Sequence, residues 1–435
     1  MFSDDPAATA SGVIIVTAVS NLAVTPSSFL NSILPPESLL VAALNNYLVI
    51  LAMSVNDAWF TGLTRKLRKR KFILLGLAMI WLQVFASAAS IQTETQKQDE
   101  IQDKKQEEKV AGIKVTRLLD APIIHPGLDP SIGENIHGPS VIRVPRWVNN
   151  TLGKYYLYFA DHKGSYIRLA YADALTGPWT IYSPGTLQLS ESLFLNTPPA
   201  VDATQRKQIE AAFAKQGIQV AHDVVEEFTT PHIASPDVHV DHANQQIIMY
   251  YHGLEGLAHQ VTRVATSADG IGFTARPQVL GQTYFRVFSW EDHTYALAMP
   301  GQLYRSVSPF GPFEKGPRLF NSDMRHNAVL RRGDTLWVFW TQVGDVPEHI
   351  KVSTIALNGD WLGWSNSVPV EVLRPEKPWE GALAPLQPSI RSTAYGQVNQ
   401  LRDPAIFIED DRIYLFYAVA GESGIGLAEL EFESP

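Results

Sequence analysis

Apolar residues alternate with polar ones along residues 232–253 in a way that predicts a β-hairpin. They recur at every second position in 238–240 and again in 247–251, and the residues between, 241–246, are polar. A single hairpin cannot bury both of its faces. The rest of the chain therefore has to supply its neighbours.

The same outline recurs four more times: a short apolar strand, a polar turn, an aromatic-rich strand and a polar loop. These strand pairs lie at 141–144 with 155–160, 286–289 with 294–298, 328–330 with 336–341, and 405–408 with 413–418. Five similar units of roughly forty residues, each with four or nearly four strands, are typical of a propeller. We therefore predict an all-β fold, a five-bladed β-propeller over residues 110–435.

The fifth unit ends after its third strand, at 424–430, and so leaves an open sheet edge. Residues 113–119 form the strand left over at the start of the domain. We expect this strand to pair beside 424–430 and close the ring. Two stretches, 183–231 and 369–400, do not fit the repeat and are expected to be insertions over a face or the rim.

The first quarter of the chain differs from the rest. Residues 1–64 contain no Lys, Arg or His, and Asn, Ser and Pro interrupt their apolar runs. We interpret them as an unstructured upstream extension, with a membrane-associated segment as the alternative. Residues 91–109 are rich in Gln, Glu, Lys and Asp and are interpreted as a solvated linker.

Residues 65–90 carry the pattern of a secretory signal. A basic run, RKLRKRK, precedes an apolar stretch and an Ala-Ser-Ala sequence that ends at Ala88. We expect an exported protein, periplasmic or extracellular. If the signal is not cleaved, residues 72–90 would anchor the protein in the membrane with the basic end in the cytoplasm.

Composition excludes several classes of function. The net charge is −9 and no basic block lies in the C-terminal three-quarters, so a nucleic-acid partner is not expected. The chain has no cysteine, which rules out disulfides, thiolate metal sites and a cysteine nucleophile. Its histidines lack the fixed spacing of a metal motif. We expect no cofactor; a structural cation on the propeller axis is the most that the pattern allows.

Propeller topology sorts the polar residues between two faces. The first strand of each blade lies nearest the axis; its start and the loop between strands two and three share one face, and the hairpin between strands one and two lies on the other. Acidic residues of these hairpins are interpreted as turn formers. They are Asp241, Glu291, Asp292, Asp334, Asp410 and Asp411.

The opposite face gathers carboxylates, histidines and arginines from all five units. They are His137, Asp161, His162, Asp237, His252, Arg286, Arg325, His326, Glu348, Arg402, Asp403 and Glu422. Such a set predicts a funnel that binds a polar ligand. The structural alternative is that Asp237, His326 and Asp403 only cap strands or close the ring through hydrogen bonds.

Two motifs carry a resemblance to a known family. Ser-Pro-Asp-Val-His-Val-Asp at 235–241 and Arg-Asp-Pro-Ala-Ile-Phe at 402–407, with the Gly-Pro-Trp and Gly-Pro-Phe turns, resemble the five-bladed propeller glycosidases. These are above all glycoside hydrolase family 43 and the related family 32, and the chain is most similar to an uncharacterised bacterial branch. The resemblance implies a carbohydrate substrate or ligand. The chain departs from the family at 135–140, which lacks the general-base Asp, and at 284–287, which lacks the general-acid Glu.

Two hypotheses of function follow. In the first, the protein is an exported glycoside hydrolase, whose reaction needs one carboxyl group to protonate the leaving oxygen and another to activate water or attack the sugar. Asp237 and Asp403 are then candidates for base and orienting acid, and Glu348, or failing it His326, for the proton donor. The expected substrate-binding residues are His137, Asp161, His162, His252, Arg286, Arg325, Arg402 and Glu422. In the second hypothesis, the funnel belongs to a non-catalytic glycan-binding propeller.

The signal pattern generates the first prediction. We expect cleavage after Ala88, because the small residues at Ala86 and Ala88 follow the apolar stretch at the spacing of a signal-peptidase site. Mass spectrometry of the mature N-terminus tests this. An intact cytoplasmic chain that begins at Met1 would contradict it.

Overall fold

The computed structural model describes residues 112–216, 220 and 222–432. The expectations for residues 1–64, 65–90 and 91–109 lie outside the described residues. Within the described ranges, no helix has both the length and the apolar character needed to cross a membrane.

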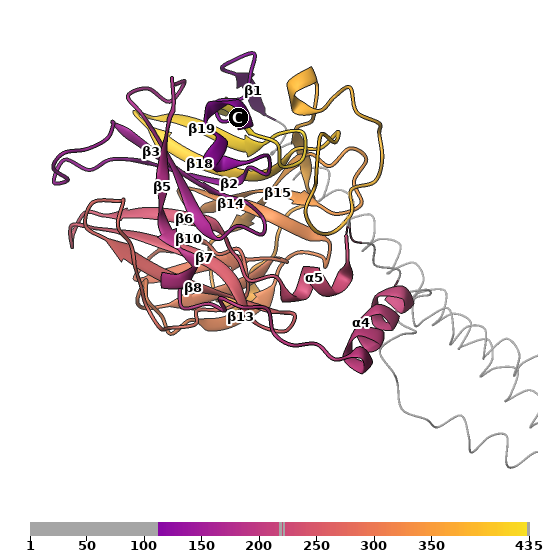
Figure 1. Ribbon diagram of the computed structural model, residues 1–435. Coiled ribbons are helices and arrows are strands. Elements are labelled where there is room, and N and C mark those ends of the chain that lie inside the picture. The colour runs from indigo at the N-terminus through magenta and orange to yellow at the C-terminus, as the bar shows by residue number, and fades with distance from the viewer. Residues whose placement is uncertain (1–111, 217–219, 221, 433–435) are drawn as a thin grey trace, which may run out of the picture. The chain divides into compact units, whose positions relative to one another are not determined.

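Five antiparallel four-stranded sheets form the blades, which confirms the all-β five-bladed propeller (Figure 1). Blade I contains β2 (His137–Arg143), β3 (Tyr155–Ala160), β4 (Tyr166–Ala172) and β5 (Thr180–Gln188). Blade II contains β6 (Ile233–Asp241), β7 (Gln246–Gly256), β8 (His259–Ser267) and β9 (Thr274–Ala275). Blade III contains β10 (Arg286–Trp290), β11 (His293–Ala298), β12 (Gln302–Ser306) and β13 (Glu314–Arg318). Blade IV contains β14 (Met324–Arg332), β15 (Thr335–Gln342), β16 (Ile350–Ala356) and β17 (Val370–Leu373). Blade V contains β18 (Arg402–Glu409), β19 (Arg412–Ala418), β20 (Ile425–Phe432) and β1 (Ile113–Arg117).

Strand β1 closes the ring, as the leftover apolar segment predicted. It pairs antiparallel with β20, from Ile113 opposite Phe432 to Arg117 opposite Ala428. The first strands of successive blades contact one another through the pairs β18 with β2, β2 with β6, β10 with β14, and β14 with β18. They lie side by side in the middle of Figure 1. The residues at their starts are thereby gathered about one axis.

Successive side chains of β7 point to opposite faces of the sheet, so that the strand packs against both neighbouring blades. Ile247, Met249 and Tyr251 belong to a core cluster that contains residues of blade I. Ile248 and Tyr250 belong to another cluster, which contains residues of blade III. Each fully buried apolar side chain of this size contributes about 1.5–3 kcal/mol. The period-2 pattern thus encodes a strand covered on both faces.

Four of the first strands carry a register shift near their start. In three of them the irregular stretch includes a proline that follows a residue of positive φ: Gly138 (63°), Ser235 (51°) and Asp403 (45°). Proline has no N–H to donate, so it fits where ladder pairing is interrupted. A bulge also bends the strand and redirects a side chain. The strand starts are therefore built to aim particular side chains.

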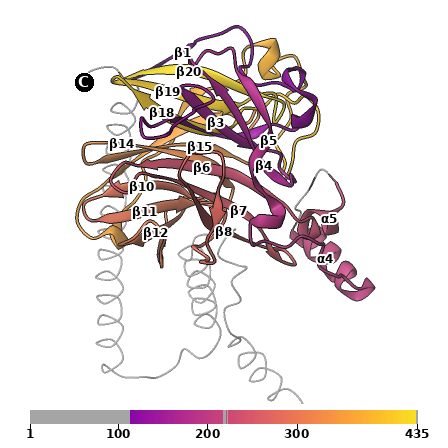
Figure 2. The same ribbon diagram turned by 60° about the vertical axis from the view of Figure 1, so that its left-hand side comes forward.

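Helices occur in the first insertion, where a helix-like segment was expected. They are α4 (Ala203–Gln216) and α5 (Val224–Thr229), which contact each other outside the sheets (Figures 1 and 2). Both insertions begin later than predicted, because β5 and β17 occupy their first residues. Short 3-10 turns lie at Pro126–Leu128, Pro130–Ile132, Leu189–Glu191, Trp361–Gly363 and Pro378–Glu380.

The buried carboxylate of Glu380 ties the second insertion to the ring closure. It accepts hydrogen bonds from Arg117 Nε at 2.7 Å and Nη2 at 2.9 Å, and from the Tyr417 hydroxyl at 2.9 Å. The backbone N–H groups of Glu376 and Lys377 donate to Oε2 at 2.9 and 3.0 Å. One fully buried charge thus joins β1, β19 and the insertion.

Removing this carboxylate should weaken the closure. We expect Glu380→Ala to lower the free energy of unfolding by about 3 kcal/mol or more, because Arg117 then loses its buried partner. The matched control is Glu431→Ala, which removes the exposed pair with Lys114 on the same strand pair and should cost less than about 1 kcal/mol. Denaturant unfolding measures both. Equal losses would contradict a special role for Glu380.

Candidate functional site

Asp403 lies at the centre of a buried polar cluster to which four blades contribute. Its Oδ1 accepts a hydrogen bond from the Tyr284 hydroxyl at 2.8 Å and lies 3.4 Å from His137 Nδ1. Its Oδ2 lies 3.4 Å from His326 Nδ1. The side chain of Asp403 is fully buried. The structure therefore brings His137, His326 and Asp403 together, as the topology predicted.

The protonation states within this cluster differ from residue to residue. Burial opposes the charge of Asp403, but the charge of His137 and its hydrogen bond outweigh burial and hold the pKa of this carboxyl well below its ordinary value. Burial lowers the pKa of His326 well below 6.5, which leaves this imidazole neutral. For His137, the charges of Asp403 and Glu422 outweigh the effect of burial, so its pKa is raised. Of the two imidazoles beside Asp403, His137 is therefore the one whose protonated form is favoured.

A second charged group lies beside the first. Arg402 Nη1 donates to Glu422 Oε1 at 2.7 Å, and Arg402 Nε lies 3.4 Å from Glu348 Oε2. Arg325 Nη1 lies 3.3 Å from the same oxygen of Glu348. Burial would raise the pKa of Glu422, but nearby His162 and Arg402 bring it well below its ordinary value. Arginines and carboxylates here neutralise one another out of contact with water.

The two insertions cover this cluster. Arg325 Nη2 and Arg402 Nη1 donate to the backbone carbonyl of Ser392 at 3.0 and 3.2 Å. Glu227, from α5, accepts a hydrogen bond from Ser392 Oγ at 2.7 Å and lies 3.3 Å from Lys163 Nζ. Helix α5, blade I and the second insertion therefore meet at one carboxylate. The insertions were expected to lie over a face or the rim, but these contacts could not be predicted from the sequence, because loops have no periodicity.

Several buried polar atoms of the cluster lack a hydrogen-bond partner among the described residues. They are His137 Nε2, His252 Nδ1, Asp403 Oδ2 and both polar atoms of the Asn327 side chain. Buried polar groups are hydrogen-bonded in the great majority of cases. These atoms can therefore form hydrogen bonds with a polar molecule bound at the axis.

The cluster does not have the arrangement of a metal centre. Within the described part of the chain, no three His, Asp or Glu side chains are placed to hold a metal ion. A structural cation on the axis stays a prediction.

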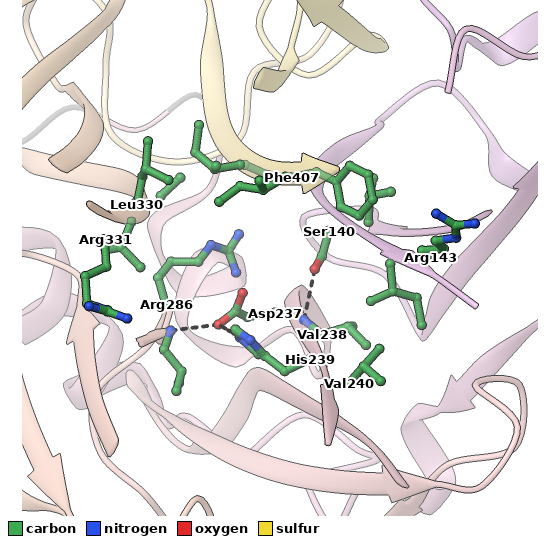
Figure 3. Close-up of a pocket in the computed structure, with 18 of the residues that line it drawn as sticks. Ser140, Arg143, Asp237, Val238, His239, Val240, Arg286, Leu330, Arg331 and Phe407 are labelled. Atoms are coloured by element: carbon green, nitrogen blue, oxygen red, sulfur yellow. Dashed lines mark hydrogen bonds and ion pairs between the residues drawn. The ribbon is translucent and has the colours of Figure 1, made fainter. Parts of the chain in front are cut away.

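An open cavity of about 380 Å³ lies at the other end of the first strands, on the side of the hairpins between strands one and two (Figure 3). Asp237 and Arg286 line this cavity, whereas Asp403, His326 and Glu348 do not. The structure thus separates five residues that were expected to share one pocket. The reason for Asp237 is that β6 begins at Ile233, so Asp237 lies four residues into the strand and past its bulge.

The other predicted residues also divide by position. His162 lies beside His137, with ring centroids 5.3 Å apart, and His252 lies 6.4 Å from the ring of Tyr284. Asp161 lies at the edge of the cluster, where it pairs with Arg168 at 3.3 Å and stays partly exposed.

Sequence reasoning missed Tyr284 and Asn327 as site residues. Tyr284 lies two residues before β10, close to the start of a first strand, but an aromatic residue there resembles ordinary core. Asn327 lies one residue after His326, within β14.

Five antiparallel blades around a buried axial cluster of carboxylates, histidines and arginines define a β-propeller protein. No protein-family model matches the chain. It is 35% identical over 322 residues to an uncharacterized protein of Acanthamoeba polyphaga mimivirus. The alignment covers 68% of this chain and 83% of the viral protein. The chain belongs to the same family as that viral protein. The expected bacterial branch stays a prediction.

Solved structures that resemble the chain include three glycosidases. The catalytic domain of the GH62 α-L-arabinofuranosidase from Coprinopsis cinerea is 14% identical, with a TM-score of 0.45 over 73% of this chain and 97% of that one. An α-L-arabinofuranosidase from Lactobacillus brevis is 11% identical, with a TM-score of 0.43 over 71% and 94%. A GH43 β-xylosidase/α-arabinofuranosidase from a compost metagenome is 9% identical, with a TM-score of 0.43 over 74% and 96%.

The paired charges predict how His137 titrates. Its folded-state pKa is raised above 6.5, so its ionisation stabilises the protein below that value, and this contribution is lost as the pH rises through the folded pKa. NMR titration of labelled histidines should show that the imidazole of His137, like that of His239, keeps its proton above pH 6.5. Asp403→Asn removes the charge and should lower that pKa, while the neutral His326 stays neutral. An unchanged titration in the Asp403→Asn variant would contradict the assignment.

Proposed function

We propose that the protein is a carbohydrate-active hydrolase that cleaves glycosidic bonds at the axial cluster. The observation that carries the proposal is the pair formed by Asp403 and His137: an ionised, buried carboxylate lies 3.4 Å from Nδ1 of an imidazole whose pKa is raised. The other nitrogen of that imidazole, Nε2, is buried without a partner among the described residues. The glycosidase-like motifs at 235–241 and 402–407 support the choice of a sugar as substrate.

The pair suits general acid catalysis. His137 Nε2 would give its proton to the leaving oxygen as the bond from that oxygen to the anomeric carbon breaks. Asp403 orients the ring and favours its protonated form, and the Tyr284 hydroxyl fixes the carboxylate. A water molecule then adds to the anomeric carbon and gives its proton to a carboxylate, for which Glu422 is our candidate.

These roles differ from those expected from sequence. His326 was an expected proton donor, but burial keeps it neutral, so it is a poor donor near pH 7. Glu348, the other expected donor, is fully buried between Arg325 and Arg402, which suits a positioning role. His137, expected only to bind substrate, takes the place of the acid.

Access to the cluster requires the cover to move. The carbonyl of Ser392 accepts from two arginines of the cluster, and α5 holds Ser392 through Glu227. We infer that substrate enters when the second insertion and α5 separate from the blades.

A second candidate function is that of a non-catalytic glycan-binding propeller. It is favoured by the ion pairing of the buried carboxylates: Glu422 with Arg402, Glu348 with both arginines, and Asp403 with two histidines. Carboxylates paired in this way can hold the shape of a site without reacting.

We also propose export of the protein, on the strength of the signal pattern in residues 65–90. A secreted or membrane-anchored propeller would meet extracellular or periplasmic polysaccharides.

Turnover on a panel of aryl and natural glycosides tests the proposed hydrolase. We expect Asp403→Asn and His137→Gln to lower kcat by about a hundredfold or more, because each removes the proton donor or its charged partner. The control is Asp410→Asn in the turn between β18 and β19, where φ is 50°, a region that Asn adopts readily. It should leave turnover unchanged.

The panel also separates the two candidate functions. Unfolding curves of all variants show whether folding is intact. Glycans that bind to the wild type without any turnover would replace the hydrolase by the binding propeller. Full activity in the folded His137→Gln variant would overturn the acid role of His137.

A further inference from the structure

We propose that the cavity at the hairpin end of the propeller axis is a second ligand site, which binds one ring of a neutral sugar through Arg286 and Asp237. The cavity is open, measures about 380 Å³ and is lined by the first strands of all five blades. This size lies within the range of small-molecule pockets, about 300–1,000 Å³. Asp403, His326 and Glu348 do not line it, so it is distinct from the axial cluster.

Arg286 supplies an unused donor. Its Nε donates to the carbonyl of Asn327 at 3.1 Å and its Nη1 to the carbonyl of Pro236 at 3.0 Å, so these atoms tie blades II and IV across blade III. The residue is only 3% exposed, and its Nη2 has no hydrogen-bond partner in the described part of the chain. Figure 3 shows the guanidinium directed into the cavity. Its structural role therefore leaves one donor for a ligand.

Asp237 supplies the matching acceptor. Its Oδ2 accepts from the backbone N–H of Val287 and pairs with His239 Nε2, each at 2.8 Å. The other carboxylate oxygen points into the cavity (Figure 3). Burial would raise the pKa of this carboxyl, but His239 and Arg286 bring it below its ordinary value, so Asp237 is ionised.

Ser140 adds a third polar group at the floor. Its Oγ accepts from the backbone N–H of Val238 at 2.9 Å (Figure 3). The hydroxyl proton is then free to point toward a ligand.

This set of groups selects a neutral polyol. The described residues show no ion pair between Arg286 and Asp237, although both line one cavity. The negative charge of Asp237 would repel a carboxylate ligand, and the positive charge of Arg286 would repel an ammonium ligand. A sugar hydroxyl both donates and accepts. One hydroxyl, or two neighbouring ones, can therefore accept from Arg286 and donate to Asp237.

The walls suit the rest of a sugar ring. Val240, Leu330 and Phe407 line the cavity above the polar floor and offer apolar surface to C–H groups (Figure 3). Arg143 and Arg331 lie at its sides (Figure 3), where Arg143 Nη1 donates to Glu409 at 2.8 Å and Arg331 Nη1 donates to the carbonyl of Gly333 at 3.1 Å.

Ligand-detected NMR and calorimetry on the full chain test the site, with D-glucose and D-xylose as probes. Glycine, acetate and methylammonium serve as comparison probes for zwitterionic, anionic and cationic ligands. We expect the sugars to bind and the charged molecules to bind at least tenfold more weakly. Tighter binding of glycine would mark a zwitterion site and overturn the proposal, as would no binding of either sugar.

Two variants locate the binding. Asp237→Asn should weaken sugar binding by about tenfold or more, the usual effect of losing a charged hydrogen-bond partner. Val240→Phe fills the cavity from its wall without altering the polar floor and should abolish binding. The matched control is Asp241→Asn, at the end of the same strand and outside the cavity, which should bind as the wild type does. Wild-type affinity in the folded Val240→Phe variant would overturn the site.

The same variants separate this proposal from the hydrolase. Asp403→Asn should abolish turnover and leave sugar binding in the cavity, because Asp403 does not line it. Sugar binding that disappears with Asp403→Asn but survives Val240→Phe would belong to the axial cluster and contradict a second site.

Discussion

A charged carboxylate buried on the propeller axis constrains the whole ring. Asp403 of blade V contacts His137 of blade I, Tyr284 next to blade III and His326 of blade IV. A charge removed from water is tolerated only when neighbouring groups compensate it with good geometry. The four blades that contribute these side chains must therefore have fixed positions along the axis. The pairing of β1 with β20 closes the ring and holds the blades in those positions.

Three first strands share one backbone conformation near their start but carry different side chains there. Gly138, Ser235 and Asp403 each precede a proline, each has positive φ and each lies in a register shift of a first strand. Their side chains range from a hydrogen atom to a carboxylate. The repeated backbone thus belongs to the fold, whereas function depends on which side chain stands at each repeat.

The sequence predicted the fold more fully than the site. Period-2 alternation specifies strands covered on both faces, so the five blades and the pairing of β1 with β20 could be foreseen. Asp403 and His326 were also placed near the axis by topology. Asp237 was expected in the same pocket, but it lines the cavity at the other end of the first strands. Strand starts and bulges shift by a few residues, and a few residues move a side chain to the other end of a short strand. The two insertions were expected to lie over a face or the rim, but their contacts with the cluster could not be predicted, since insertions have no repeat to constrain them.

Arg286 contacts both the cavity and a residue of the axial cluster. Its guanidinium lies 4.3 Å from the centroid of the Tyr284 ring, and the hydroxyl of that ring holds Asp403. Asp403 in turn sets the protonation of His137. A ligand that draws the guanidinium of Arg286 toward Asp237 would weaken the contact between Arg286 and Tyr284. The hydrogen bond from the Tyr284 hydroxyl to Asp403 would then be altered as well. Because binding free energies are reciprocal, occupation of the axial cluster would then alter affinity in the cavity by the same factor.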